Sequence, residues 1–162
     1  MTILSAIDIS KVILTLIYTF QDKDPDKDFP PEMITRLKLL KLLYYVQGYH
    51  LAMFKQEVFK EEIQAWKHGP VVKEVYDWVK AKEDKDLNKE LLSTKDLNSL
   101  NLHDQQLELI TDVLKLYNKY SAYGLRDKTH KEEPWLFAYE EGKNNIITKE
   151  SLTTFFTPLI SK

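Results

Sequence analysis

Apolar residues recur mainly at intervals of three and four positions along the chain, a spacing typical of α-helices. The first helix is expected to run from a cap at Ser5 or Asp8 to about Thr19. The same spacing predicts further helices over residues 71–80, from Asn101 or Asp104 to about Tyr117, from Ser121 to about Thr129, around Trp135 with Pro134 in its first turn, and after Thr148. The sequence therefore predicts a mainly α fold, and 162 residues fit a single compact domain over residues 1–162.

One helix, expected over residues 32–54, differs from the others because it has two apolar faces. At about 100° per residue, these faces are formed by Leu37, Leu40, Tyr44 and Leu51, and by Leu39, Leu42, Val46, Tyr49 and Met53. Two narrow polar strips separate them, one with Lys38 and Lys41, the other with Arg36, Gln47 and His50. A helix that is apolar on two sides is normally central, so the fold is expected to be built around this buried helix. Each polar group that it carries inward then needs a hydrogen-bond partner.

The pattern changes after this helix. Residues 58–66 combine β-branched and aromatic residues with partial alternation, which indicates one or two short strands or an extended arm. A small antiparallel β element near residues 56–66 therefore remains an option within the mainly α fold. Gly69 and Pro70 interrupt the chain, and the next helix is expected to point its apolar side inward, through Val72, Val75, Tyr76 and Val79. Residues 81–99 are charged and predict no more than short helical turns.

Charge and composition narrow the function classes. The 23 basic and 25 acidic residues give a net charge of -2, so no overall positive field attracts nucleic acid. Lys38 and Lys41 form a short basic strip, but no helix collects the basic cluster expected of a DNA-reading helix. The absence of cysteine excludes disulfides and thiol catalysis. The apolar run at residues 12–17 is too short for a membrane span and lacks the features of a signal peptide, so a cytoplasmic protein without membrane association is expected.

No pattern of catalytic or metal-binding residues emerges. The four histidines do not pair at i,i+4, and there is no HExxH, GxSxG or phosphate-binding glycine loop; the histidines are His50, His68, His103 and His130. The carboxylate-rich residues 22–28 alternate with lysines, which favours a solvated loop over a calcium site. We therefore expect no catalytic residue, cofactor or metal, and no enzymatic activity. An enzyme with a histidine–carboxylate site is the least favoured alternative.

Aromatic residues make up 12% of the chain, and two tryptophans lie beside turns. Trp66 precedes Gly69 and Pro70, and Trp135 follows Pro134. The simpler interpretation is that both indoles plug helix ends and close the core. Alternatively, they rim a cleft for a partner, since Trp, Tyr and Arg dominate interface hot spots. Stacking of nucleobases on these rings is a distant third interpretation.

Several segments resemble one known family. They are KLLYYVQGYHL at residues 41–51, Phe59, IQAWKHGPVV at residues 63–72 with Val75 and Tyr76, Thr129 and His130, Glu133 to Trp135, and the terminal Ile147, Glu150, Phe155 and Phe156. In this order and over most of the chain, they are similar to the Panacea (SocA-like) antitoxins, often labelled phage-associated proteins. The AW-x-x-GPV block is the most specific of them. His68 departs from the family, which usually has Tyr there.

The resemblance implies a mostly helical domain, associated with phages or mobile elements, that neutralises a cognate protein toxin encoded in an adjacent gene by direct binding. One family member also delivers its toxin to a ClpXP-type protease, and such an adaptor role is kept here as an alternative. So is a nucleic-acid-binding regulator of a mobile element. Candidate residues for partner binding or the family motif are Gln47, His50, Trp66, His68, Gly69, Pro70, Val71, Tyr76, Thr129, His130, Glu133 and Trp135.

Overall fold

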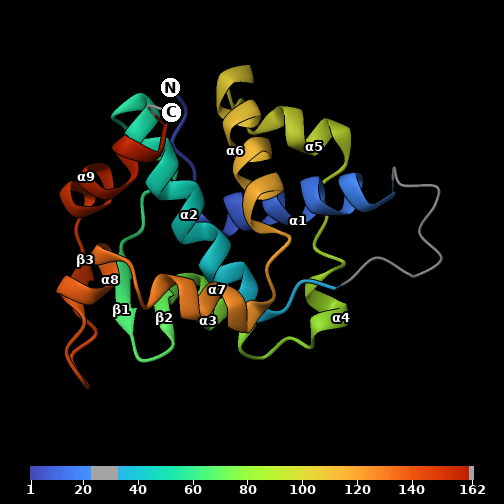
Figure 1. Ribbon diagram of the computed structural model, residues 1–162. Coiled ribbons are helices and arrows are strands. Elements are labelled where there is room, and N and C mark those ends of the chain that lie inside the picture. The colour runs from blue at the N-terminus through green and yellow to red at the C-terminus, as the bar shows by residue number, and fades with distance from the viewer. Residues whose placement is uncertain (23–32, 161–162) are drawn as a thin grey trace.

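The structure is a computed structural model that describes residues 1–22 and 33–160 (Figure 1). Over these residues the chain is mainly helical with a small antiparallel sheet, as predicted. The helices are α1 (Ala6–Asp22), α2 (Arg36–Phe54), α3 (Lys73–Val79), α4 (Asp84–Leu87), α5 (Thr94–Ser99), α6 (Asp104–Tyr117), α7 (Ala122–Thr129), α8 (Glu133–Ala138) and α9 (Lys149–Ile160). The strands are β1 (Ile63–Trp66), β2 (Gly69–Val71) and β3 (Ile146–Ile147). Residues 23–28 of the carboxylate-rich run lie outside the described part of the chain.

Helix α2 is the predicted central helix. It is buried almost continuously from Lys38 to Ala52, with α9, α6, α7 and α1 packed around it (Figure 1). It starts at Arg36 and not at residue 32, because the Thr35 hydroxyl accepts the Lys38 N–H at 3.2 Å and caps the helix there. Enclosure on every side also corrects the interpretation of the Lys38 and Lys41 strip: their side chains are 4% and 0% exposed. The strip is part of the interior and not a basic surface.

The sheet has the strand order β2-β1-β3. Strand β1 falls within the predicted β region, and β2 returns antiparallel to it with Trp66 opposite Gly69. The prediction of a helix from residue 71 is wrong at its start: Val71 belongs to β2, and α3 begins at Lys73. Pro70 is tolerated in β2 because this strand lies at the sheet edge, where one side makes no ladder hydrogen bonds. Strand β3, which had no sequence prediction, pairs Ile147 with Ile63.

Aromatic rings fill the core on one side of α2. Tyr45 stacks on Tyr117 with ring centroids 3.9 Å apart, and Phe156 of α9 meets Tyr44 edge to face at 5.5 Å. Phe156 also covers Gly48, where even a methyl group would lie 2.2 Å from the ring. This close approach lets α2 and α9 pack tightly, so α2 is held rigidly against its neighbours.

The inward-facing side of helix α3 also differs from prediction, at Tyr76. Val75 and Val79 are buried, as expected, but Tyr76 is 38% exposed. The helix is only seven residues long and packs through a narrow stripe. Tyr76 therefore lies at the edge of that stripe, toward the β1–β2 turn, and its ring meets Trp66 at 4.9 Å.

Candidate functional site

A pocket of about 520 Å³ lies where the first turns of α2, the β1–β2 turn and α3 meet. We call it the Trp66 pocket. Its lining residues are Thr35, Arg36, Leu37, Leu40, Lys41, Trp66, Lys67, His68, Val71, Tyr76, Val79, Lys80 and Asp84. Trp66 is half-buried, and its ring contacts Tyr76 edge to face. The pocket therefore offers an aromatic and aliphatic surface bordered by charged side chains.

The β1–β2 turn at the centre of this site is fixed by α7 and α8. The Trp135 indole N–H donates to the Trp66 carbonyl at 2.8 Å. The His130 ring lies between two backbone carbonyls, with Nε2 2.8 Å from that of Lys67 and Nδ1 2.6 Å from that of Arg126. It also meets the Trp135 ring at 4.1 Å. The two aromatic-bearing turns identified in the sequence therefore form one rigid unit.

The two tryptophans have different roles in the fold. Trp135 is 7% exposed, stacks on Tyr139 at 4.5 Å and closes the core. The Trp66 indole N–H donates to Gln64 Oε1 at 2.8 Å, and the Trp66 side chain lines the pocket. The core-closing interpretation thus describes Trp135, while Trp66 also presents a face to the cleft.

Gly69 allows the turn to sit directly on α2. Its φ of 113° is a backbone conformation that side chains disfavour, and a Cβ here would lie 2.6 Å from Lys41 Cε and 3.0 Å from Thr129 Oγ1. Thr129 is fully buried, and its hydroxyl donates to the Arg126 carbonyl at 2.8 Å. Gly69 and Thr129 thus make close packing possible and do not reach the surface of the pocket.

Lys41 is the charged group that sequence reasoning did not select. Its Nζ donates to the Pro70 carbonyl at 3.0 Å. Burial lowers the pKa of Lys41 to about 7, with a further lowering from the Arg126 guanidinium. A lysine between apolar residues of a doubly apolar helix was the available signal, but its contact with Pro70 depends on the fold.

The pocket border is predominantly cationic. Arg36, Lys67 and Lys80 are exposed there, while Asp84 is the only acidic residue among the described residues that line the pocket. The Arg36 guanidinium donates to the Lys80 carbonyl at 2.9 Å. The pKa of the exposed His68 is lowered, by partial desolvation and then by the positive charges of Arg126, Lys67 and others. The local charge is thus positive, although the whole chain carries -2.

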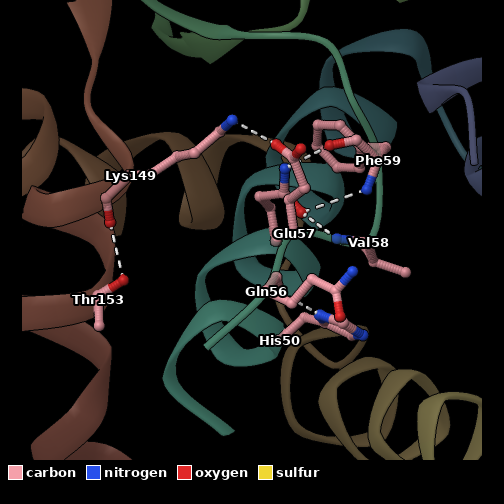
Figure 2. Close-up of polar contacts among 8 residues, drawn as sticks. His50, Gln56, Glu57, Val58, Phe59, Lys149 and Thr153 are labelled. Carbon is pink, nitrogen blue, oxygen red and sulfur yellow. Dashed lines mark hydrogen bonds and ion pairs between the residues drawn. The ribbon is translucent and has the colours of Figure 1, made fainter. Parts of the chain in front are cut away.

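Gln47 and His50 lie toward the other end of α2. Figure 2 shows His50 there, with residues 56–59 returning along the helix after the chain leaves it. Gln47 Nε2 donates to the Phe59 carbonyl at 2.8 Å, and its Oε1 accepts the Val58 N–H at 2.9 Å. Both candidate side chains are buried, at 2% and 0% exposure. They hold residues 56–59 against α2 and do not line the pocket.

The partners of His50 define its protonation. Nδ1 lies against the Gln56 carbonyl, which can only accept, so Nδ1 carries the proton (Figure 2). Nε2 lies 3.0 Å from Gln106 Nε2 and accepts from it. Burial lowers the pKa of His50, although its backbone hydrogen bond opposes this, and the neutral ring suits both contacts.

The acidic candidate of the family motif, Glu133, is exposed at the start of α8. The neighbouring Glu132 is the buried one: it accepts the phenol hydroxyls of Tyr44 at 3.0 Å and Tyr45 at 3.1 Å. Burial raises the pKa of Glu132 to about 7, against the opposing effect of the two phenols. Two adjacent buried tyrosines that both need an acceptor were the sequence signal for this carboxylate.

Over residues 1–22 and 33–160, no three His, Asp or Glu side chains are grouped so that they could hold a metal ion. None of the helices in that part of the chain is both long and apolar enough to cross a membrane.

The architecture is that of a mainly helical domain with an open pocket beside a braced β-turn. The family model for the SocA-like antitoxin, Panacea domain, matches residues 39–136, and the chain belongs to this family. The matched part contains the β1–β2 turn and every candidate residue, whereas Arg36 and Leu37 of the pocket precede it. The comparisons with curated proteins and with solved structures give no match.

Proposed function

We propose that this protein is the antitoxin of a toxin–antitoxin pair and that it neutralises its toxin by direct binding at the Trp66 pocket. The observation that carries the proposal is the pocket itself, in which Trp66 and Tyr76 present their rings beside Arg36. Partly exposed Trp, Tyr and Arg side chains around a concave surface are the residues that contribute most to protein–protein affinity. Membership of the SocA-like family supports a protein partner.

The rigidity of the turn favours this role. The Trp66 and Lys67 carbonyls are held by Trp135 and His130, and Gly69 is pressed onto α2. A surface that is already ordered loses little conformational entropy when a partner binds, so more of the contact energy becomes affinity. This arrangement suits binding, and we propose that the protein acts in the cytoplasm by binding its toxin and not by catalysis.

The alternatives have less support. The basic strip that motivated a nucleic-acid regulator consists of Lys38 and Lys41, which are buried. Lys38 donates to the Asn118 carbonyl at 2.8 Å and Lys41 to that of Pro70, so neither reaches a phosphate. Association with a phage or mobile element and delivery to a ClpXP-type protease have no structural observation in their favour.

Co-expression with the product of the adjacent gene tests the proposal. That product alone should stop growth, co-expression should restore it, and the two proteins should co-purify. Trp66→Ala should abolish rescue, whereas Tyr123→Ala should preserve it, because Tyr123 is 69% exposed on α7 and lies outside the pocket. The proposal is contradicted if the product of the adjacent gene does not stop growth when expressed alone, or if it does not co-purify with this protein.

A further inference from the structure

We infer that the Trp66 pocket receives an acidic segment of the partner protein, whose carboxylates pair with the cationic border while an apolar side chain packs on Trp66 and Tyr76. This rests on the proposed function and specifies the chemistry of the surface that the antitoxin recognises. The partner is thus expected to present Asp or Glu next to a large apolar residue.

Charge complementarity is the first argument. Four side chains that line the pocket are Arg or Lys, and one is Asp; they are Arg36, Lys41, Lys67, Lys80 and Asp84. Lys80 has an exposed ion pair with Asp77 at 3.4 Å, which contributes little. Among the described residues, no carboxylate lies within ion-pair distance of Arg36 or Lys67. Like charges gathered without counter-charges repel each other, and a partner carboxylate would relieve that repulsion.

Arg126 extends the positive region behind the pocket wall. It belongs to α7, where the His130 ring lies 2.6 Å from the Arg126 carbonyl and 2.8 Å from the Lys67 carbonyl of the β1–β2 turn, and its charge lowers the pKa of both Lys41 and His68. Its Nε is buried and has no hydrogen-bond partner among the described residues. Uncompensated buried donors are uncommon, because each one costs free energy in the unbound fold. The cationic region is thus larger than the border that the solvent reaches.

The second argument is the apolar floor, which distinguishes a protein segment from a phosphate. Leu37, Leu40, Val71 and Val79 join the two aromatic rings. A cavity of about 520 Å³ is within the size range of specific ligand sites, and such a lining favours an apolar side chain. A nucleic acid would instead need a basic track along its backbone. The observations therefore favour an acidic peptide segment with an apolar anchor.

A binding measurement with defined peptides tests this without knowledge of the toxin. The probes are an acetylated peptide with a central Trp flanked by Glu, the same peptide with Gln at every Glu position, and an oligothymidylate of equal charge. NMR shifts of the ¹⁵N-labelled full chain, followed at the Trp66 indole and the Lys67 and His68 amides, give the site and the affinity. The Glu peptide should bind about ten-fold more tightly than the Gln peptide. The difference should shrink between about 50 mM and about 200 mM salt.

Charge reversal provides the matched variants. The double variant Lys67→Glu with Lys80→Glu should lower the affinity for the Glu peptide at least about ten-fold. Lys60→Glu with Lys95→Glu changes the net charge equally at exposed positions outside the pocket and should leave affinity within about two-fold. Equal binding of the two peptides, equal effects of the two double variants, or tighter binding of the oligothymidylate at these resonances overturns the inference. If the toxin complex depends on Trp66 but the peptides show no charge preference, the proposed function stands and this inference fails.

Discussion

The two ends of α2 use polar residues in opposite ways. Toward the C-terminal end, Gln47 and His50 are covered by the chain itself, with partners on residues 56–59 and at Gln106. Figure 2 shows His50 beside Gln56. Nearer the N-terminal end, Lys41 has its Nζ on a carbonyl of the β1–β2 turn and lies beside an open pocket. Lys41, Gln47 and His50 all belong to the same segment that resembles the family, residues 41–51.

The comparison shows that belonging to a motif does not separate contact residues from core residues. The Gln47 amide satisfies the hydrogen bonding of two buried backbone groups, the Val58 N–H and the Phe59 carbonyl. Its place in the motif therefore follows from folding alone. At the Trp66 pocket, Arg36 donates to the Lys80 carbonyl and Lys80 pairs with Asp77, but no carboxylate of the described chain pairs with Arg36 or Lys67. We therefore expect mutations of the buried Gln47 to change stability, and mutations of the partly exposed pocket residues Trp66 and Tyr76 to change binding.

The largest loss of stability is expected from Gly48→Ala. The added methyl would lie 2.2 Å from Phe156 Cε2, so α2 and α9 would have to separate. We expect about 3 kcal/mol lower free energy of unfolding, measured by urea denaturation. Adding Phe156→Leu should recover part of the loss by making room. A change of less than about 0.5 kcal/mol would show that α9 yields easily and that α2 is not rigidly held.

Gln47→Leu tests the closed end of α2 directly. It leaves the buried Val58 N–H and Phe59 carbonyl without their partner, which should cost about 2 kcal/mol in the same denaturation experiment. Under conditions where the variant is folded, its affinity for the toxin should equal that of the wild type. A weakened complex from a fully folded Gln47→Leu variant would place this end of α2 in the contact surface.

Lys41, on the part of α2 that borders the Trp66 pocket, should make the free energy of unfolding depend on pH. The unfolded chain keeps the Lys41 proton up to about pH 10.5, while the folded chain releases it near pH 7. The unfolded state therefore holds more protons between these values, and the free energy of unfolding rises with pH across that window. Lys41→Met should remove this rise and stabilise the protein below pH 7. Chemical denaturation at several pH values measures it, and an unchanged slope would mean that Lys41 stays charged in the fold.

Glu132 gives the opposite trend and serves as the control. Its pKa is raised from 4.5 to about 7 in the fold, so the folded state holds more protons between these values. The free energy of unfolding should fall as the pH rises through that window, and Glu132→Gln should flatten only that part of the curve. If both variants changed the same pH region, the assignment of the two groups would be wrong.

The smallest effect on stability is expected from Tyr76→Ala. The ring is 38% exposed and its main contact is Trp66, so the free energy of unfolding should fall by no more than about 1 kcal/mol. A larger loss in thermal denaturation would mean that Tyr76 is part of the core, as the sequence pattern had indicated.

Much of the fold could be predicted because it depends on local patterns. The two apolar faces of α2 predicted its central position, and Ser121 and Thr148 predicted the starts of α7 and α9. Strand β3 could not be predicted, because two residues are stabilised only by pairing with the distant Ile63. Strand β2 was not predicted either, because Gly69 and Pro70 are typical turn residues and indicate a turn.

The site was only partly predictable, because it too depends on contacts between residues far apart in the sequence. Trp66, His68 and Tyr76 were selected from composition and motif, and the structure places them together at one pocket. Lys41 and Arg126 were missed, because their mutual position is created by the packing of α7 against α2. A helical pattern reports which residues face inward, but it does not report which charges meet there.

The dissociation constant of the antitoxin–toxin complex tests the central claim most directly. We compare wild type, Trp66→Ala, Tyr76→Ala and Gln47→Leu, each shown to be folded. The account predicts that each pocket variant weakens the complex at least about thirty-fold, corresponding to about 2 kcal/mol for a hot-spot residue, while Gln47→Leu has no effect on affinity. Wild-type affinity in both pocket variants would contradict the account.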